Sequence, residues 1–509
     1  MNKIDKLSRR MHLGTALLWG GAALAIVLGL VRLWPSMADS PAPNLSNKVA
    51  PQGTQRGFIG LPDANVFSIQ NISTEAAHIT LTIALPNGTV ITTDTETVPP
   101  ESIRTYSDPE NLTSLARIET DVPTYTFAAN YELGELGNDA YLGLERLEEG
   151  TGPPSPGDPW YLLIPQVMKD CDGWNTAFTI QNMSRMDGTV VVTLHSHDGS
   201  PIHSEYFVVP QNGALPFDLA DISMGTPSCC VCSAVIAGDV ELVVASVRAY
   251  HDVSKSHSAY QGRGSWESSD VLVAPALFKA SNLQTSEICV QNGGTSDANV
   301  VINYSDGIRV NTTIPSFAVH CFEQGLEGHA AGWSGGAVIT STAAEPLVAV
   351  ANVTAYDGTT PVGRWSYTLP AQGMVTRTLA LPLLFTACDG WTSEIHLYNY
   401  NDSPAEITPR YVSHPTDFVY CADSFTIPAH SVLSISQAEL PRVFRQSMAY
   451  FTATQPVAAV VSVTSDEPLG DTDRHFGYSA AYPDGPVSFP DTCDTIYGVF
   501  VPAILKEAQ

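Results

Sequence analysis

Positive charge is scarce in this chain of 509 residues. Lys and Arg number 24 against 52 Asp and Glu, which gives a formal net charge of −28. A surface with this balance repels phosphates and anionic lipid, so nucleic acid is excluded as a partner. Charged residues of both signs make up only 15% of the sequence. That composition favours an exposed β-protein over a cytosolic helical enzyme.

Catalytic signatures are missing as well. No GxSxG, HExxH, P-loop or GxGxxG motif occurs in the context that its chemistry requires. Helical patterns are nearly absent beyond the N-terminus. We therefore expect no enzymatic activity, no cofactor and no metal.

What the chain does contain is a repeat of about 110 residues. Four apolar segments end in Asn, and these Asn residues are separated by 111, 110 and 107 positions: Phe67–Asn71, Phe178–Asn182, Ile288–Asn292 and Ile395–Asn399. Such a period is too long for a solenoid and is typical of a string of small domains. A divergent repeat of one module also leaves no segment for a separate catalytic domain.

Within each repeat, runs of 5–8 residues alternate between apolar and polar and are bounded by Gly, Pro and Asn. This pattern predicts antiparallel β-sandwiches. We expect an all-β fold, a tandem array of four immunoglobulin-like sandwiches with these bounds: 57–168, 169–279, 280–386 and 387–509. The Gly/Pro-rich stretch 145–159 predicts the most flexible joint of a semi-flexible array.

A second landmark is a strand with Pro at its centre. It occurs at Pro165, Pro275, Pro382 and Pro502. Four such strands match four Asn segments only if each closes the unit before it, which is our hypothesis. Pro cannot donate to a ladder, so each of these strands is expected at a sheet edge.

The N-terminus predicts export. Basic residues precede an uncharged stretch, Leu13 to Leu30, whose length lies between that of a signal peptide and that of a membrane span. Residues 1–34 are interpreted as a signal peptide or a signal-anchor helix, and both alternatives stay open. Residues 35–56 are a Pro-rich spacer. The chain is expected to be exported to the cell surface, membrane-anchored or secreted.

Nine cysteines fit an oxidising compartment. We expect bridges between Cys289 and Cys321, between Cys388 and Cys421, and between Cys171 and one of Cys229, Cys230 or Cys232. Cys493 stays unassigned, and an odd count leaves one thiol over.

Candidate binding residues are few, and each has a structural alternative. Trp174 and Trp391 follow identical CDG turns and are the predicted ligand-binding residues, because a Trp beside a turn can stack on a sugar. The alternative is that each caps the end of a sandwich beside a disulfide.

Other polar groups carry weaker signals. The strand-terminal Asn of each repeat is expected to initiate a turn. His195 and His197 alternate on a strand before Asp198, and Asp466 to Asp473 is an acidic loop; each suggests a metal, with a turn or a solvated loop as the alternative. Abundant N-x-S/T sequons predict that their loops face solvent, among them Asn71, Asn87, Asn111, Asn182, Asn303, Asn311, Asn352 and Asn401.

A family resemblance rests on motifs that are clearest after residue 160. The Pro strand Leu163–Val167, the turn Gly173–Thr176, the strand Phe178–Asn182 and the run Gly335–Ile339 together resemble the tandem immunoglobulin-like repeats of large, mostly uncharacterised bacterial cell-surface proteins. The resemblance implies a surface stalk, coat component or adhesin, and it brings no catalytic residues.

We therefore expect a non-catalytic extracytoplasmic protein that acts as a structural stalk or coat component. The alternative is an adhesin or a multivalent array of modules that bind glycan or protein. Expected partners are a glycan or a surface protein, and the membrane through the N-terminal helix. For a binder, the second repeat is the best candidate for the divergent unit.

Overall fold

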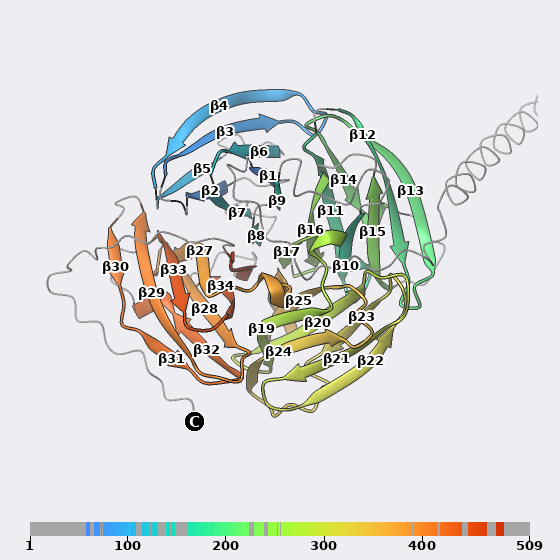
Figure 1. Ribbon diagram of the computed structural model, residues 1–509. Helices are drawn as coiled ribbons and strands as arrows, with labels where there is room; N and C mark the ends of the chain where they lie inside the picture. Colours follow the sequence, from blue (N-terminus) through green and yellow to red (C-terminus); the bar gives the residue numbers. More distant parts are fainter. Residues whose placement is uncertain are drawn as a thin grey trace, which may run out of the picture. The chain divides into compact units, whose positions relative to one another are not determined.

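The structure, a computed structural model, describes residues 57–482 apart from gaps, of which the longest are 108–114, 131–138, 148–160, 223–228, 440–445 and 466–474. The chain divides after Ala50, and every described residue belongs to the second part, Pro51–Gln509. Regular structure in the described residues is β-strand, with only single turns of 3-10 helix (Figure 1). The all-β prediction is therefore confirmed.

The expected N-terminal helix, 1–34, and the spacer, 35–56, lie outside the described residues. In the part of the chain that is described, no helix has the length and apolar character needed to cross a bilayer.

The strands fall into four successive sets, coloured from blue to red in Figure 1. Set 1 contains β1 (Gly57–Leu61), β2 (Val66–Asn71), β3 (Ala77–Ala84), β4 (Val90–Val98), β5 (Ile103–Ser107), β6 (Leu115–Thr120), β7 (Thr124–Asn130), β8 (Asp139–Leu142) and β9 (Leu144–Leu147). Set 2 contains β10 (Tyr161–Lys169), β11 (Trp174–Asn182), β12 (Gly188–His195), β13 (Pro201–Val209), β14 (Ala214–Asp218), β15 (Cys230–Gly238), β16 (Val243–His251), β17 (His257–Gln261) and β18 (Arg263–Gly264).

Set 3 contains β19 (Val271–Lys279), β20 (Gln284–Asn292), β21 (Ala298–Tyr304), β22 (Arg309–Ile314), β23 (Val319–Glu323), β24 (Trp333–Ser341), β25 (Leu347–Asp357) and β26 (Thr360–Thr368). Set 4 contains β27 (Thr378–Phe385), β28 (Trp391–Asn399), β29 (Ala405–His414), β30 (Val419–Cys421), β31 (Phe425–Ile427), β32 (Ser431–Ser436), β33 (Gln446–Ala453), β34 (Ala458–Ser465) and β35 (His475–Ser479). The short helical turns are η3 (Leu219–Asp221), η4 (Ser265–Glu267), η5 (Gln372–Met374) and η6 (Gln437–Glu439).

All four sets share one connectivity. One antiparallel sheet runs in the order fourth, third, sixth and first strand, as in β13-β12-β15-β10. The other runs fifth, second, seventh and eighth, as in β14-β11-β16-β17. In set 4 the fourth strand is split into β30 and β31, which both pair with β29.

The two sheets of a set enclose one apolar core. In set 3, Ile302 and Ile339 come from one sheet and Val290 and Val353 from the other, and all four are fully buried. The alternating pattern read from the sequence explains this, since side chains of a strand point to opposite faces in turn. The two antiparallel sheets of set 3 thus share one core.

The connectivity differs from that of an immunoglobulin domain, where the first strand lies in the sheet of the second, fourth and fifth strands. Here the first strand pairs with the sixth, as β19 does with β24, and the second pairs with the fifth and seventh. The antiparallel sheets were predicted, but the order of their strands does not match the immunoglobulin order.

The Pro strands open a set; they do not close the preceding one. β10, with Pro165, pairs with β15 of the following strands, and its Leu162 and Ile164 belong to the set 2 core. β19 and β27 do the same in sets 3 and 4. Our hypothesis was therefore wrong, and the predicted boundaries at 168, 279 and 386 fall about one strand too late. The Pro502 strand lies outside the described residues.

The Pro residues at the centres of β10, β19 and β27 (Pro165, Pro275 and Pro382) each lie in a β-bulge. The pairing register shifts between Ile164 and Val167, between Ala274 and Leu277, and between Leu381 and Leu384. β19 and β27 are edge strands, and β10 is flanked only by the two-residue β18. The edge prediction is therefore confirmed for β19 and β27 and not for β10. A residue without an N–H is tolerated in all three strands because the ladder is interrupted there.

In three sets, a buried Tyr of the eighth strand donates a hydrogen bond to a backbone carbonyl oxygen in this bulge. The phenols of Tyr260, Tyr367 and Tyr478 donate to the carbonyl oxygens that follow the Pro, those of Gln166, Ala276 and Leu383. Burial raises the pKa of all three phenols, so they remain protonated donors. The sequence analysis missed this pairing.

Consecutive sets meet through hairpin turns and strands. The turn between β12 and β13 lies against set 3: a Cβ added at Gly199 would collide with the carbonyl oxygen of Ser316. Gly88 lies in the same way against Gln211 of set 2. Both glycines have φ near +80°, so only glycine fits the conformation and the close approach.

The contacts between successive sets continue from set 4 to set 1. The first strands of sets 2 and 3 lie against the second and seventh strands of the following set, β10 against β20 and β25, and β19 against β28 and β34. β27 of set 4 lies in the same way against β2 and β7 of set 1. The Tyr450 phenol donates to the carbonyl oxygen of Asn71 at 3.4 Å. The eighth strands β8, β17, β26 and β35 contact one another in succession, and β35 contacts β8.

This is a head-to-tail interface used repeatedly within one chain. It corrects the expectation of a semi-flexible array, because the fourth set contacts the first as well as the third. The first three residues of the predicted flexible joint, 145–147, belong to β9 (Leu144–Leu147), which pairs with β1. The rest of that segment lies outside the described residues.

Candidate functional site

Trp174 and Trp391 begin the second strand of their sets, directly after a tight turn. Reciprocal backbone hydrogen bonds close the turns between Cys171 and Trp174 and between Cys388 and Trp391. Each Trp is only 8% exposed. Stacking of a sugar on either ring would therefore require the surrounding side chains to move.

The surroundings of the two rings favour the structural alternative. Trp174 packs on His251 with ring centroids 5.1 Å apart, and the Arg364 guanidinium of set 3 lies 4.5 Å from its centroid. Trp391 belongs to the set 4 core and lies 5.3 Å from the Phe476 ring. Both Trp side chains are packed into buried apolar clusters of their sets.

The strand-terminal Asn side chains are fully buried clamps. Asn292 Oδ1 accepts from the Gly294 N–H at 2.9 Å, which confirms the turn prediction. Its Nδ2 also donates to the carbonyl oxygens of Ser296 (2.7 Å) and Ile314 (3.0 Å). The same three-way arrangement recurs in the other sets, at Asn71, Asn182 and Asn399.

Burial also corrects the prediction that all sequons face solvent. Asn71 and Asn182 are 0% exposed and Asn352 is 1% exposed. Asn111 lies outside the described residues.

The predicted His pair does not converge on a metal. His195 is buried, its Nδ1 lies 2.9 Å from the Gly199 carbonyl oxygen, and burial lowers its pKa. His197 is exposed. Asp198 is held by the Ser196 hydroxyl and the Ser200 N–H, which lower its pKa to about 2. These residues form the turn that docks on set 3. The acidic loop Asp466 to Asp473 lies outside the described residues.

An Asp–His dyad in set 3 was not anticipated. His329 Nδ1 lies 2.7 Å from Asp306 Oδ2, and its Nε2 lies 3.0 Å from Gln324 Oε1. The ring stacks on Trp333 with centroids 3.8 Å apart, and its side chain is 0% exposed. Both nitrogens are thus engaged by acceptors inside the protein, which leaves neither of them to activate a nucleophile.

The letters of a GxSxG motif do occur beside this dyad, at Gly332 to Gly336. Ser334 lies on β24 and pairs with Phe278 of β19. A nucleophile elbow requires a sharp strand-to-helix turn, which is not the local structure here. The dyad instead fastens the segment that precedes β24.

A polar cluster lies at the junction of sets 2 and 3. Glu287 Oε1 accepts from Arg364 Nη2 (2.8 Å), Gln166 Nε2 (3.0 Å) and Asn352 Nδ2 (3.2 Å). Gln166 Oε1 in turn accepts from Asn352 at 2.8 Å and from Arg364 at 3.2 Å. The Arg364 side chain is 4% exposed and that of Glu287 is 24% exposed. We call these four residues the junction cluster.

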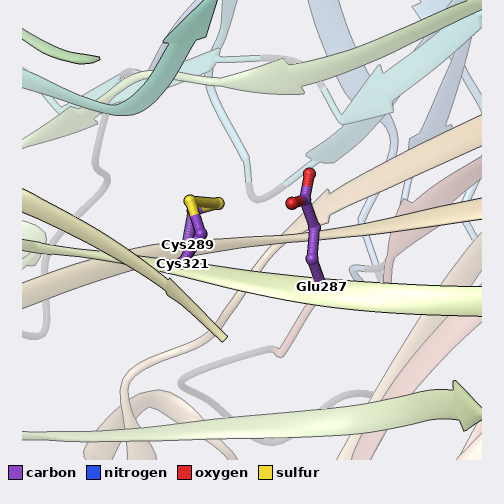
Figure 2. A group of neighbouring side chains, drawn as sticks. All are labelled: Glu287, Cys289 and Cys321. Atoms are coloured by element: carbon purple, nitrogen blue, oxygen red, sulfur yellow. A yellow bond between two sulfur atoms is a disulfide. The ribbon is translucent and has the colours of Figure 1, made fainter. Parts of the chain in front are cut away.

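Glu287 lies beside the Cys289–Cys321 disulfide (Figure 2). Among the described residues, this is the one group of three potential metal ligands whose ligand atoms lie within 4.8 Å of one another. Thiolates bind metals, and disulfide sulfurs are not thiolates. Since Glu287 already accepts from three donors, we assign the group to the junction between the sets.

The disulfides match the sequence predictions in part. Cys289 is bonded to Cys321, and Cys171 to Cys229, as expected. Cys230 and Cys232, two residues apart on β15, form a further pair. The predicted bridge from Cys388 to Cys421 is not among the described disulfides. Cys421 is disulfide-bonded, whereas Cys388 is part of the set 4 core beside Trp391. Cys493 lies outside the described residues.

Comparisons with known proteins give no assignment. No protein family and no curated protein matches the chain. Among solved structures, Thermotoga maritima 1070 is 14% identical, matches 21% of this chain and 95% of its own, and has a TM-score of 0.18. A tetra-tandem repeat from the extending region of a large adhesion protein is 10% identical over 81% of this chain and 93% of its own, with a TM-score of 0.09. A glycoside hydrolase family 32 structure from Bifidobacterium adolescentis is 7% identical over 79% of this chain and 98% of its own, with a TM-score of 0.13. Scores this low assign neither function nor family.

Proposed function

We propose that the chain is a non-catalytic extracytoplasmic protein whose four sandwich domains act together as one structural component of the cell surface, in the manner of a coat or scaffold subunit. The domains of this proposal begin at the first strands β1, β10, β19 and β27. The observation that carries it is the repeated junction, which joins each set to the next and the fourth to the first. Such closure suits a compact building block better than a stalk.

Two features support an extracytoplasmic location. The basic and apolar N-terminal segment has the pattern of an export signal. Disulfides in sets 2 and 3 belong to oxidising compartments.

The arrangement of titratable groups supports the absence of catalysis. The described Asp–His dyad is buried with both ring nitrogens engaged, and the junction cluster is occupied by its own hydrogen bonds.

Location can be tested by thiol labelling and protease treatment of intact cells that produce the chain. We expect Cys171, Cys229, Cys289 and Cys321 to resist alkylation until a reductant is added. We also expect added protease to degrade the chain without lysis. Alkylation of all four thiols without reductant, together with protection from protease until lysis, would contradict an extracytoplasmic location.

A second candidate function, protein binding, is favoured by one observation. Tyr206 and Val208 on the edge strand β13 are 57% and 56% exposed, and Tyr is enriched at protein interfaces. They belong to the second repeat, the unit that sequence reasoning marked as the best candidate for a binder.

A further inference from the structure

Among the described residues, two disulfides join separate segments of the chain. Cys171 and Cys229 are 58 positions apart, and Cys289 and Cys321, on the paired strands β20 and β23, are 32 positions apart. A cross-link of this kind restricts the unfolded chain and so stabilises the fold. The coupling is mutual, and the fold in turn protects these bonds from reduction.

The bond between Cys230 and Cys232 differs, because it lies within one strand, β15, and connects no second segment. It spans 2 positions, with the two Cα atoms 5.7 Å apart. The entropy that a cross-link removes from the unfolded chain grows as 1.5R ln n with the length n of the closed loop. A span of 2 positions against 32 is 16 times shorter, so loop closure favours this bond less by a factor of 16 to the power 1.5, or about 60.

β15 is held in place by its neighbours and does not require this bond. Residues 230–232 pair with residues 167–169 of β10, and from Ser233 onward β15 also pairs with β12. These backbone hydrogen bonds do not involve the sulfur atoms. We therefore expect the pair to be reduced and oxidised within the folded protein.

The two sulfurs differ in their access to solvent. Cys230 is half-buried at the start of β15, whereas Cys232 is 0% exposed and belongs to the set 2 core. Lys169 lies directly opposite Cys230 in the strand register, and its ammonium group donates to the Leu219 and Ala220 carbonyl oxygens at 2.8 and 2.9 Å. A nearby cation favours the thiolate form of a cysteine. Cys230 is therefore the sulfur that an outside thiolate can attack and the one better suited to leave as a thiolate.

We propose that Cys230 and Cys232 form a thiol–disulfide exchange site whose substrate is a dithiol. A thiolate of the dithiol attacks Cys230 Sγ, the bond to Cys232 breaks, and Cys232 takes up a proton to become a thiol. The second thiolate of the dithiol then attacks the dithiol's own sulfur in the mixed disulfide, which closes a disulfide in the substrate and releases Cys230. The dithiol is oxidised by two electrons, the pair is reduced by two, and no other oxidant takes part.

The substrate is a dithiol because Cys232 competes with any monothiol. Once the first step has freed it, the Cys232 thiol lies two residues from the mixed disulfide and re-forms the original bond. A second thiol on the substrate, equally close to the mixed disulfide, drives the exchange forward. One chain oxidises one dithiol, so the exchange is stoichiometric and does not depend on the structural role proposed for the chain.

An equilibrium titration of the purified full-length chain tests the proposal. The oxidised chain is incubated in glutathione buffers of increasing reducing strength, quenched with acid and alkylated, and peptide mass spectrometry gives the reduced fraction of each pair. We expect Cys230–Cys232 to be half-reduced at a glutathione ratio, reduced squared over oxidised, about 60-fold lower than Cys289–Cys321. Reduction of both pairs at the same ratio overturns the proposal, and so does a chain in which Cys230 and Cys232 are not bonded to each other.

A matched pair of variants tests which sulfur reacts. Cys232→Ser leaves the accessible Cys230 thiol, and Cys230→Ser leaves the buried Cys232 thiol. We expect Cys232→Ser to form a mixed disulfide with an aromatic disulfide reagent at least about tenfold faster than Cys230→Ser. Circular dichroism checks that both variants are folded, and equal rates in two folded variants contradict the assignment of Cys230 as the attacked sulfur.

The source of the dithiol is decided with two substrates, each at one equivalent: dithiothreitol and a reduced peptide with two cysteines. Oxidation of both assigns the site to polypeptide dithiols, and oxidation of dithiothreitol alone assigns it to small dithiols. The folded double variant Cys230→Ser/Cys232→Ser, which keeps the other bridges, should oxidise neither. Oxidation of neither substrate by the wild type, or of both by the double variant, overturns the proposal.

Discussion

Arg364→Met is expected to lower the free energy of unfolding by about 3 kcal/mol. The substitution removes the guanidinium that lies 2.8 Å from Glu287 and over the Trp174 ring. Glu287 would keep its charge and its two amide donors but lose its only cationic partner in the junction cluster. Breaking a buried pair from one side leaves an uncompensated charge, which is more damaging than removing both partners.

The matched control is the double variant Glu287→Gln/Arg364→Met, which removes both charges. Chemical denaturation of the wild type, Arg364→Met, Glu287→Gln and the double variant gives the coupling free energy between the two charges. We expect the double variant to be more stable than Arg364→Met. Equal losses in the two would show that the lost packing of Arg364 on Trp174, and not its charge, holds this junction.

Asn292→Ala is expected to destabilise set 3 by about 3 kcal/mol or more, because it leaves buried backbone groups unpaired at about 1–3 kcal/mol each. The carbonyl oxygen of Ile314 and the N–H of Gly294 lose their partner. Asn292→Asp retains the acceptor but directs a carboxylate at carbonyl oxygens, so we expect it to be no more stable than the Ala variant.

Asn303→Ala provides the control within the same set, since Asn303 is exposed on β21. Substitutions of exposed residues usually change the free energy of unfolding by no more than about 0.5 kcal/mol. Urea unfolding of Asn292→Ala, Asn292→Asp and Asn303→Ala measures the loss in free energy of unfolding for each variant. If Asn292→Ala were as stable as Asn303→Ala, the buried side chain would not be the clamp that its hydrogen bonds indicate.

Features local to one repeat could be predicted from the sequence. Alternating apolar residues gave the strands, the terminal Asn gave the turn, and the missing N–H of Pro gave the edge position. The Cys289–Cys321 bridge followed from two cysteines on apolar strands of one repeat. Each depends on residues close in sequence or on a backbone property of one residue type.

Assignment of strands to sets failed for an equally specific reason. Counting four Pro strands against four Asn segments hid the fact that β1, Gly57–Leu61, opens set 1 without a Pro. Similarly, CDGW looked like a site because it occurs twice. The equivalent turn of set 3, closed by Ser281 and Gln284, forms without it. The motif therefore marks a tight turn that other residues can also form.

Contacts between sets gave no signal in the sequence. Gln166 bonds to Asn352 across 186 positions, and Tyr450 to Asn71 across 379. Neither periodicity nor composition encodes such pairs, and the positions equivalent to Gln166 are occupied by Ala276 and Leu383. The junction cluster and the closure of set 4 on set 1 therefore required the structure.

The closure can be measured directly by site-specific photo-cross-linking from position 450. A benzoylphenylalanine replacing Tyr450 would place its reactive carbonyl near the Tyr450 hydroxyl position, 3.4 Å from the Asn71 carbonyl oxygen in the wild type. Irradiation of the dilute monomeric chain, followed by peptide mass spectrometry, is expected to give an intramolecular link to the peptide that contains Asn71. A folded variant that links only to peptides of set 4 would contradict the closure and would restore the open array.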